Sequence, residues 1–101
     1  MKGSLFLLAR QAGYDLVAEY RFAPPRRWRF DYALIEQMIA IEVEGGIWTA
    51  GRHNRPMGFL KDMEKYNEAS ALGWKIFRTT PGNETDVWPY VERALLIGTE
   101  R

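Results

Sequence analysis

The chain has 101 residues, a formal net charge of +1 at neutral pH, and 47% hydrophobic residues. This length is typical of a single domain, and the apolar and aromatic side chains suffice for a core. Because the net charge is close to zero, a basic surface can arise only where charges are segregated. The sequence has no cysteine, which excludes disulfides and thiolate metal sites. No apolar run approaches the ~20 residues of a membrane-spanning helix, and residues 1–9 are too short for a signal peptide, so we expect a cytoplasmic protein without membrane contact.

A helix and a strand are predicted in the first quarter of the chain. Residues 4–12 are predicted to be helical, and Gly13 follows them as a typical stop signal. Residues 17–22 alternate with the period of two that indicates a strand. The pair Pro24-Pro25 then ends this strand, because proline cannot donate to the hydrogen-bond ladder.

Residues 26–46 are predicted to form a β-hairpin, which is the central element of the chain. In both strands apolar residues alternate with charged or small residues, so that one face is apolar and the other carries the charges. The apolar positions are Trp28, Phe30, Tyr32 and Leu34 in the first strand and Ile39, Ile41 and Val43 in the second.

The register of this hairpin decides which charged residues meet. If the reversal is centred on Glu36-Gln37, Asp31 lies opposite Glu42 and Arg29 lies opposite Glu44. A shift by one residue would place Asp31 and Glu42 on opposite faces of the sheet. Glu-Gln is a poor two-residue turn, but a four-residue loop on the same centre preserves the pairing.

With this register, three carboxylates converge on one face of the hairpin, those of Asp31, Glu42 and Glu44. Like charges at cross-strand distance repel one another, so a cation is expected to hold them together. Carboxylate oxygens are hard ligands of the kind that Mg²⁺ and other divalent cations prefer. The pattern therefore predicts a divalent-metal site on the hairpin.

The second half of the chain is predicted to contain an irregular segment, a helix, a strand and a last helix. They cover residues 47–58, 59–72, 74–80 and 87–96, in that order. The first of these helices presents a helical stripe, expected to be core, that consists of Phe59, Met63, Tyr66 and Ser70. Because this helix joins the third strand to the fourth, these two strands are expected to be parallel within a mixed sheet. The predicted order is α-β-β-β-α-β-α.

The residues within this order resemble those of a known nuclease superfamily. Asp31 is followed on the next strand by Glu42-Val43-Glu44, within EVEGG, and then by DMEKYNEA and GWKIFRTTP. This combination resembles the PD-(D/E)XK superfamily, which includes restriction endonucleases, Holliday-junction resolvases and very-short-patch-repair endonucleases, and the resemblance covers residues 19–81. It implies a single nuclease-like domain over residues 1–101, with a restriction-endonuclease-like mixed β-sheet flanked by helices.

The same resemblance implies a metal site. Asp31 matches the motif aspartate and Glu42 the (D/E) position, so both would ligate Mg²⁺, with the Val43 carbonyl as a further ligand. Mn²⁺ would be expected to substitute for Mg²⁺. Many members carry an additional acidic residue before the motif aspartate, and Glu19 is the candidate here, from a strand.

The motif lysine is expected two residues after Glu42, where this chain has Glu44. Related nucleases place the lysine on the neighbouring helix, and Lys65 is the first candidate for that role, with Lys61 second. Glu44 would then receive a proton, bind a second metal ion, or hold Lys65 by an ion pair. The simpler alternative for Lys65 is a surface pair with Asp62 at i,i+3 spacing.

Basic residues near the hairpin and in the irregular segment are candidates for DNA contacts. They are Arg26, Arg27, Arg29, Arg52, His53, Arg55 and Lys61. Arginines beside the metal site are well placed for phosphate groups. Alternatively, the hairpin arginines only solvate a strand edge and prevent aggregation, and His53 is an ordinary loop residue rather than a general base or a phosphate ligand.

The resemblance implies a Mg²⁺-dependent DNA endonuclease, first of all a structure-selective enzyme similar to Holliday-junction resolvases. A site-specific or nicking repair-type endonuclease is the alternative enzyme, and a DNA-binding module without catalysis is the alternative from another class. The expected partners are DNA, including branched DNA, and a second copy of the chain in a homodimer whose interface uses Trp48 or Trp88. The expected location is the cytoplasm of a bacterium or of a phage-infected host.

Overall fold

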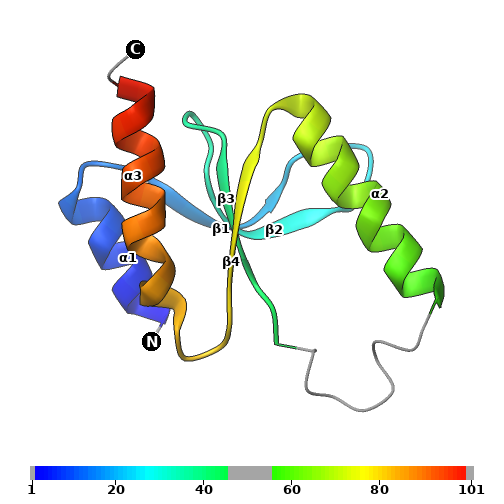
Figure 1. Cartoon of the computed structure of the whole chain (residues 1–101), viewed down its shortest axis with the longest axis horizontal. Coiled ribbons are helices and arrows are strands. Elements are labelled where there is room, and N and C mark those ends of the chain that lie inside the picture. Colours follow the sequence, from blue (N-terminus) through cyan, green and yellow to red (C-terminus); the bar gives the residue numbers. More distant parts are fainter. Residues whose placement is uncertain (1, 46–55, 100–101) are drawn as a thin grey trace.

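The computed structural model describes residues 2–45 and 56–99 and is drawn in Figure 1. The elements are α1 (Lys2–Gln11), β1 (Leu16–Arg21), β2 (Arg29–Leu34), β3 (Ile39–Val43), α2 (Pro56–Leu72), β4 (Lys75–Thr79), the 3₁₀ helix η1 (Glu84–Val87) and α3 (Trp88–Thr99). The chain is thus an α/β protein with a mixed sheet flanked by helices, as its alternating patterns predicted. Among the described residues, no helix has both the length and the apolar character needed to cross a membrane.

The sheet has the strand order β1-β2-β3-β4. The neighbours β1/β2 and β2/β3 are antiparallel, whereas β3 and β4 are parallel. The prediction of a parallel pair is therefore confirmed, and its cause is the long connection through α2. Figure 1 shows α1 and α3 on one side of the sheet and α2 on the other.

The hairpin between β2 and β3 has the predicted register. Tyr32 pairs with Ile41 and Leu34 with Ile39, so the next positions outward bring Asp31 opposite Glu42. The turn covers residues 35–38 and is closed by a hydrogen bond from the Met38 N–H to the Ile35 carbonyl, 3.1 Å long. This four-residue turn has the expected centre, so the carboxylates of Asp31 and Glu42 meet between β2 and β3.

The expectation that the hairpin has one apolar face and one charged face is wrong, because helices cover both faces. Tyr32 and Leu34 pack with residues of α1 and α3, as predicted for the apolar side. Phe30, however, belongs to a second core with Ala33, Ala40, and Ala69 of α2. The alternation breaks at Asp31, where the regular ladder also stops, so the strand presents its aromatic residues to different sides before and after this point.

Two predictions about single side chains are corrected by the packing of the helices. Met63 was expected in the core, but it is 42% exposed, whereas Ala69 is buried among the described side chains of α2. Trp88, a candidate for a dimer interface, is only 4% exposed and packs in the core beside Val87 and Val91. Trp48, the other candidate, lies outside the described residues. The rotation of each helix about its axis depends on the sheet beneath it, which a stripe within one helix does not specify.

Candidate functional site

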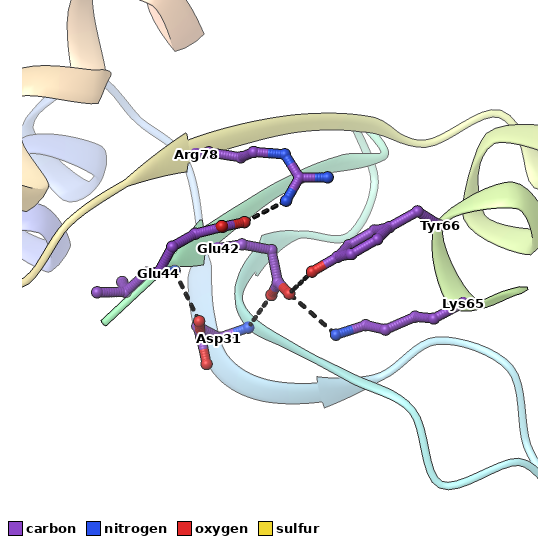
Figure 2. Close-up of polar contacts among 7 residues, drawn as sticks. Asp31, Glu42, Glu44, Lys65, Tyr66 and Arg78 are labelled. Atoms are coloured by element: carbon purple, nitrogen blue, oxygen red, sulfur yellow. Dashed lines mark hydrogen bonds and ion pairs between the residues drawn. The ribbon is translucent and has the colours of Figure 1, made fainter. Parts of the chain in front are cut away.

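Asp31 and Glu42 interlock where β2 and β3 separate. The backbone N–H of Asp31 donates to Oε2 of Glu42 at 2.9 Å, and the N–H of Val43 donates to Oδ2 of Asp31 at 2.7 Å (Figure 2). Each carboxylate thus takes the place that a backbone carbonyl would occupy in a regular ladder. The sequence places two acids at the point where the ladder ends, and the backbone N–H groups there hold both acids in position.

Glu42 also receives two donors from α2. Its side chain is almost entirely buried, with only 6% of the residue exposed. The Lys65 ammonium lies 2.9 Å from Oε1, and the Tyr66 hydroxyl donates to the same oxygen at 2.7 Å. A buried carboxylate is tolerated when such partners replace water. In Figure 2 both side chains point from α2 toward Glu42, which explains why this face of the helix carries polar groups.

Glu44 does not join the two other carboxylates, which corrects the prediction of three converging acids. Its side chain forms an ion pair with Arg78 of β4 (Figure 2). Arg78 is the strand neighbour of Glu42 in the parallel β3–β4 pair, and its guanidinium lies 4.4 Å from the ring centroid of Tyr66. Among residues 2–45 and 56–99, no group of three acidic, histidine or cysteine side chains is arranged to hold a metal ion. Glu44 therefore holds Arg78, not Lys65.

The ion pair also perturbs Arg78. Burial lowers the pKa of the guanidinium, but the hydrogen bond and charge of Glu44 outweigh burial and raise the pKa above its ordinary value. For Tyr66, burial and the hydrogen bond to Glu42 both raise the pKa of the hydroxyl. The Tyr66 hydroxyl therefore stays protonated at neutral pH and remains a donor to Glu42, while Arg78 remains a cation.

The Asp31 carboxyl is costly to ionise in the folded chain. Burial is the largest cause that raises the pKa of Asp31, and the negative charges of Glu42 and Glu19 raise it further. The N–H of Val43 and the ammonium of Lys65 lower the pKa, but they offset only part of this effect. When both acids are ionised, Asp31 and Glu42 share the ammonium of Lys65, which leaves one negative charge in excess among these three residues.

We expect the raised pKa of Asp31 to appear in the pH dependence of folding. Because the pKa of Asp31 is higher in the folded state than in the unfolded state, the folded state binds more protons above the ordinary value of 3.8, so this group's contribution to stability falls as pH rises. In Asp31→Asn, an amide oxygen still accepts from Val43, and no charge forms. Urea unfolding with a chelator present should show the variant gaining on the wild type from pH 4 to pH 7. A constant difference over that range would contradict the assigned shift.

Glu19 of β1 and Arg29 of β2 are neighbours of Asp31, and β1 lies on the edge of β2 that is opposite to β3. Glu19 has a φ of 55° and stands between two cross-strand pairs of β1 with β2, which places it opposite Asp31. Its carboxylate pairs with Arg29 at 3.6 Å. The expectation that Arg29 lies opposite Glu44 is wrong, because the β2–β3 ladder ends at Tyr32 and Ile41, and the Glu44 N–H donates to the Thr79 carbonyl of β4 at 2.7 Å. On the other edge of β2, Arg29 lies opposite Arg21 of β1.

The other residues proposed for DNA contacts are scattered. Arg26 pairs with Glu64 of α2 at 3.0 Å and stacks over Trp28 at 4.3 Å from its centroid. Arg27 and Lys61 are exposed. Three further candidates, Arg52, His53 and Arg55, lie outside the described residues. The described part of the chain thus retains its hairpin arginines as candidate contacts.

The donor set around Asp31 suits a divalent cation with oxygen ligands. Mg²⁺ is often held by one or two carboxylates together with water, so Asp31 and Glu42 are sufficient in number. The N–H of Val43 points to β2, and in an extended strand the carbonyl of the same residue points to the same edge. The Val43 carbonyl is therefore expected at the edge of β3 that faces β2. Asp31 and Glu42 remain the candidate ligands among the described residues, the Glu42 oxygens already accept from Asp31, Lys65 and Tyr66, and Glu44 takes no part.

Sequence analysis missed two residues of this site, Tyr66 and Arg78. Tyr66 was predicted as part of a stripe in the core, and the hydroxyl of a buried tyrosine is a signal that a hydrogen-bond partner lies nearby. Arg78 was predicted only as part of the strand at residues 74–80, and a charged residue within such a strand is a signal that a partner lies nearby.

Comparisons of this chain with models of known protein families, with curated proteins and with solved structures found no match.

Proposed function

We propose that this chain is a Mg²⁺-dependent DNA endonuclease with a restriction-endonuclease-like, PD-(D/E)XK-type fold. The single observation that carries the proposal is the joining of Asp31 and Glu42 by reciprocal backbone hydrogen bonds, with Lys65 at 2.9 Å from Glu42. Two acids on neighbouring strands can hold a metal ion for phosphodiester hydrolysis, and a lysine beside them can stabilise charge on the phosphate.

The chain's own residues supply binding, orientation and charge for this reaction. When bound, Mg²⁺ would activate a water molecule and neutralise charge on the phosphate. Asp31, Glu42 and the Val43 carbonyl would hold it. Lys65 carries an ammonium group that can donate to a phosphate oxygen as negative charge develops there, which lowers the barrier. Tyr66 holds the Glu42 carboxylate in one orientation through its hydroxyl.

The position of Glu44 favours a second candidate function, a DNA-binding module without catalysis. Glu44 stands where the family has its lysine, and it is neutralised by Arg78 rather than placed near Asp31. In this alternative, Lys65 serves only to neutralise Glu42, and the arginines alone bind the phosphates. The two candidates differ in one respect that is simple to measure, which is cleavage in the presence of a metal ion.

Within the enzyme reading, we propose a structure-selective activity on branched DNA in a homodimer, acting in a bacterial or phage-infected cytoplasm. Phosphate contacts from arginines carry no sequence information, which favours recognition of DNA shape. A two-fold dimer would present two sites to two strands. Since Trp88 is buried, the dimer would have to use other apolar residues, and the outer face of α3 exposes Tyr90 and Ile97.

We expect the purified chain to cut DNA with Mg²⁺ or Mn²⁺ and to leave it intact with a chelator. Supercoiled plasmid measures nicking, and a panel of four-way junctions, flaps and linear duplexes measures preference. Junctions should be cut on paired strands, and sedimentation should give a dimer. A monomer that cuts one linear sequence and ignores junctions would favour the site-specific or nicking repair-type enzyme. Binding without any cleavage would favour the DNA-binding module.

A further inference from the structure

An open hollow lies where the chain passes from β1 to β2. Its volume is about 290 Å³, and it is lined by Arg21, Arg27 and Arg29. Arg21 and Arg29 are direct cross-strand partners, and Arg27 belongs to the connection between the two strands. Like charges directly opposite one another destabilise a strand pair. Three exposed guanidinium groups around one hollow give it a local positive charge that an anion would neutralise.

The contacts within the hollow leave most of this positive charge available. Arg21 donates to the carbonyls of Pro25 and Arg26, at 3.5 and 3.2 Å, which orients its side chain without neutralising it. Arg29 pairs with the carboxylate of Glu19 at 3.6 Å, and the side chains of both residues are more than half exposed. Such an exposed pair is weak. Within the described residues Arg27 has no ion pair.

Arg26 is set apart from these arginines, although it is close to them in sequence. Its guanidinium is paired with Glu64 at 3.0 Å and stacks over Trp28. This pair is also more than half exposed and is therefore weak, but Arg26 is not among the described residues that line the hollow. Arg26 thus faces α2 and Trp28, whereas Arg21, Arg27 and Arg29 face a common space.

The hollow adjoins the Asp31–Glu42 pair along the sheet. Arg29 precedes Asp31 by two residues on β2, which corresponds to about 7 Å along a strand. Glu19 bridges the two places, because it stands opposite Asp31 and pairs with Arg29. A polymer with regularly spaced phosphates that is bound at the arginines would extend past Asp31 and Glu42, whereas a single small anion would occupy the hollow alone.

We propose that Arg21, Arg27 and Arg29 bind backbone phosphates of a nucleic-acid strand and hold that strand beside Asp31 and Glu42. The planar fork of each guanidinium matches the oxygens of a phosphate group. The inference rests on the proposed function for the identity of the ligand as a nucleic acid. Because contacts to phosphates position a strand without reading its bases, the hollow contributes affinity that does not depend on base sequence.

The test is equilibrium binding of a fluorescein-labelled duplex by the full chain, followed by anisotropy with a chelator present so that no cleavage occurs. We expect Arg27→Gln to weaken binding about tenfold, equally for two unrelated sequences, and to reduce the slope of log affinity against log salt by about one. Arg21→Gln should act similarly, and Arg27→Lys should retain most of the affinity. The matched control is Arg10→Gln on α1, an exposed arginine outside the hollow, which should behave as wild type. Circular dichroism checks that every variant is folded.

The outcomes separate this inference from the proposed enzyme. If the wild-type chain cuts no DNA with Mg²⁺ but Arg27→Gln weakens binding as described, the enzyme proposal fails and the hollow stands. If Mg²⁺-dependent cleavage is found but Arg21→Gln and Arg27→Gln bind with unchanged affinity and salt slope, the hollow is overturned. A wild-type chain that binds inorganic pyrophosphate but not the labelled duplex would also overturn it.

Discussion

Asp31→Asn and Glu42→Gln are each expected to lower Mg²⁺-dependent DNA cleavage by more than about a hundredfold. Loss of a group that only supports a metal ligand typically costs 10–100-fold in affinity or activity, and these side chains are the proposed ligands themselves. Asp31→Asn keeps an oxygen that can accept from the Val43 N–H, so its fold should be retained. Plasmid nicking measures the activity, and a thermal shift with added Mg²⁺ measures metal binding independently of cleavage.

A matched control keeps this prediction specific to the site. Glu92→Gln removes a carboxylate from the exposed surface of α3, on the other side of the sheet, and should leave both nicking and the Mg²⁺-induced thermal shift unchanged. The wild-type chain should be stabilised by millimolar Mg²⁺, whereas Asp31→Asn should not. Near wild-type cleavage by either Asp31→Asn or Glu42→Gln would show that the metal site is elsewhere.

Lys65→Ala is expected to have the second largest effect, a loss of about a hundredfold or more in turnover with little change in DNA affinity. The removal of one donor that acts on developing charge has effects of this size. Lys61 lies one helical turn earlier on α2 and is exposed, so Lys61→Ala is the control and should keep turnover. Turnover and substrate affinity are measured separately by single-turnover cleavage and by anisotropy.

Lys65→Ala should also destabilise the fold, because it leaves Glu42 with one donor fewer in a buried place. The Lys65 side chain is only 15% exposed, and breaking a buried pair on one side costs about 3–5 kcal/mol. The double variant with Glu42→Gln and Lys65→Met removes both charges. It should regain stability in urea unfolding but should not cleave DNA. If Lys65→Ala keeps full turnover while Lys61→Ala is inactive, Lys61 carries the role. If both variants keep turnover, neither lysine does.

The pairing of Asp31 with Glu42 could be predicted from the sequence because it depends on nearby residues. The period of two defines the strands, and the turn at residues 35–38 sets the register, so the observed pairing of Tyr32 with Ile41 followed directly. The parallel pairing of β3 with β4 could be predicted as well, because a helical connection between two strands of one sheet favours it. Lys65 was proposed from a resemblance, and its approach to Glu42 depends on the packing of α2 against the sheet.

The sequence by itself therefore determined the α/β class and the order of the elements. With a reversal centred on Glu36-Gln37 it also predicted the meeting of two acids, because these features depend on residues close along the chain. The tertiary structure alone decided that Glu44 pairs with Arg78, that Tyr66 donates to Glu42, and that Trp88 is buried. These contacts join elements far apart in the chain. They depend on the rotation of each helix and on the strand that flanks β3, and neither is contained in the periodicity of a single segment.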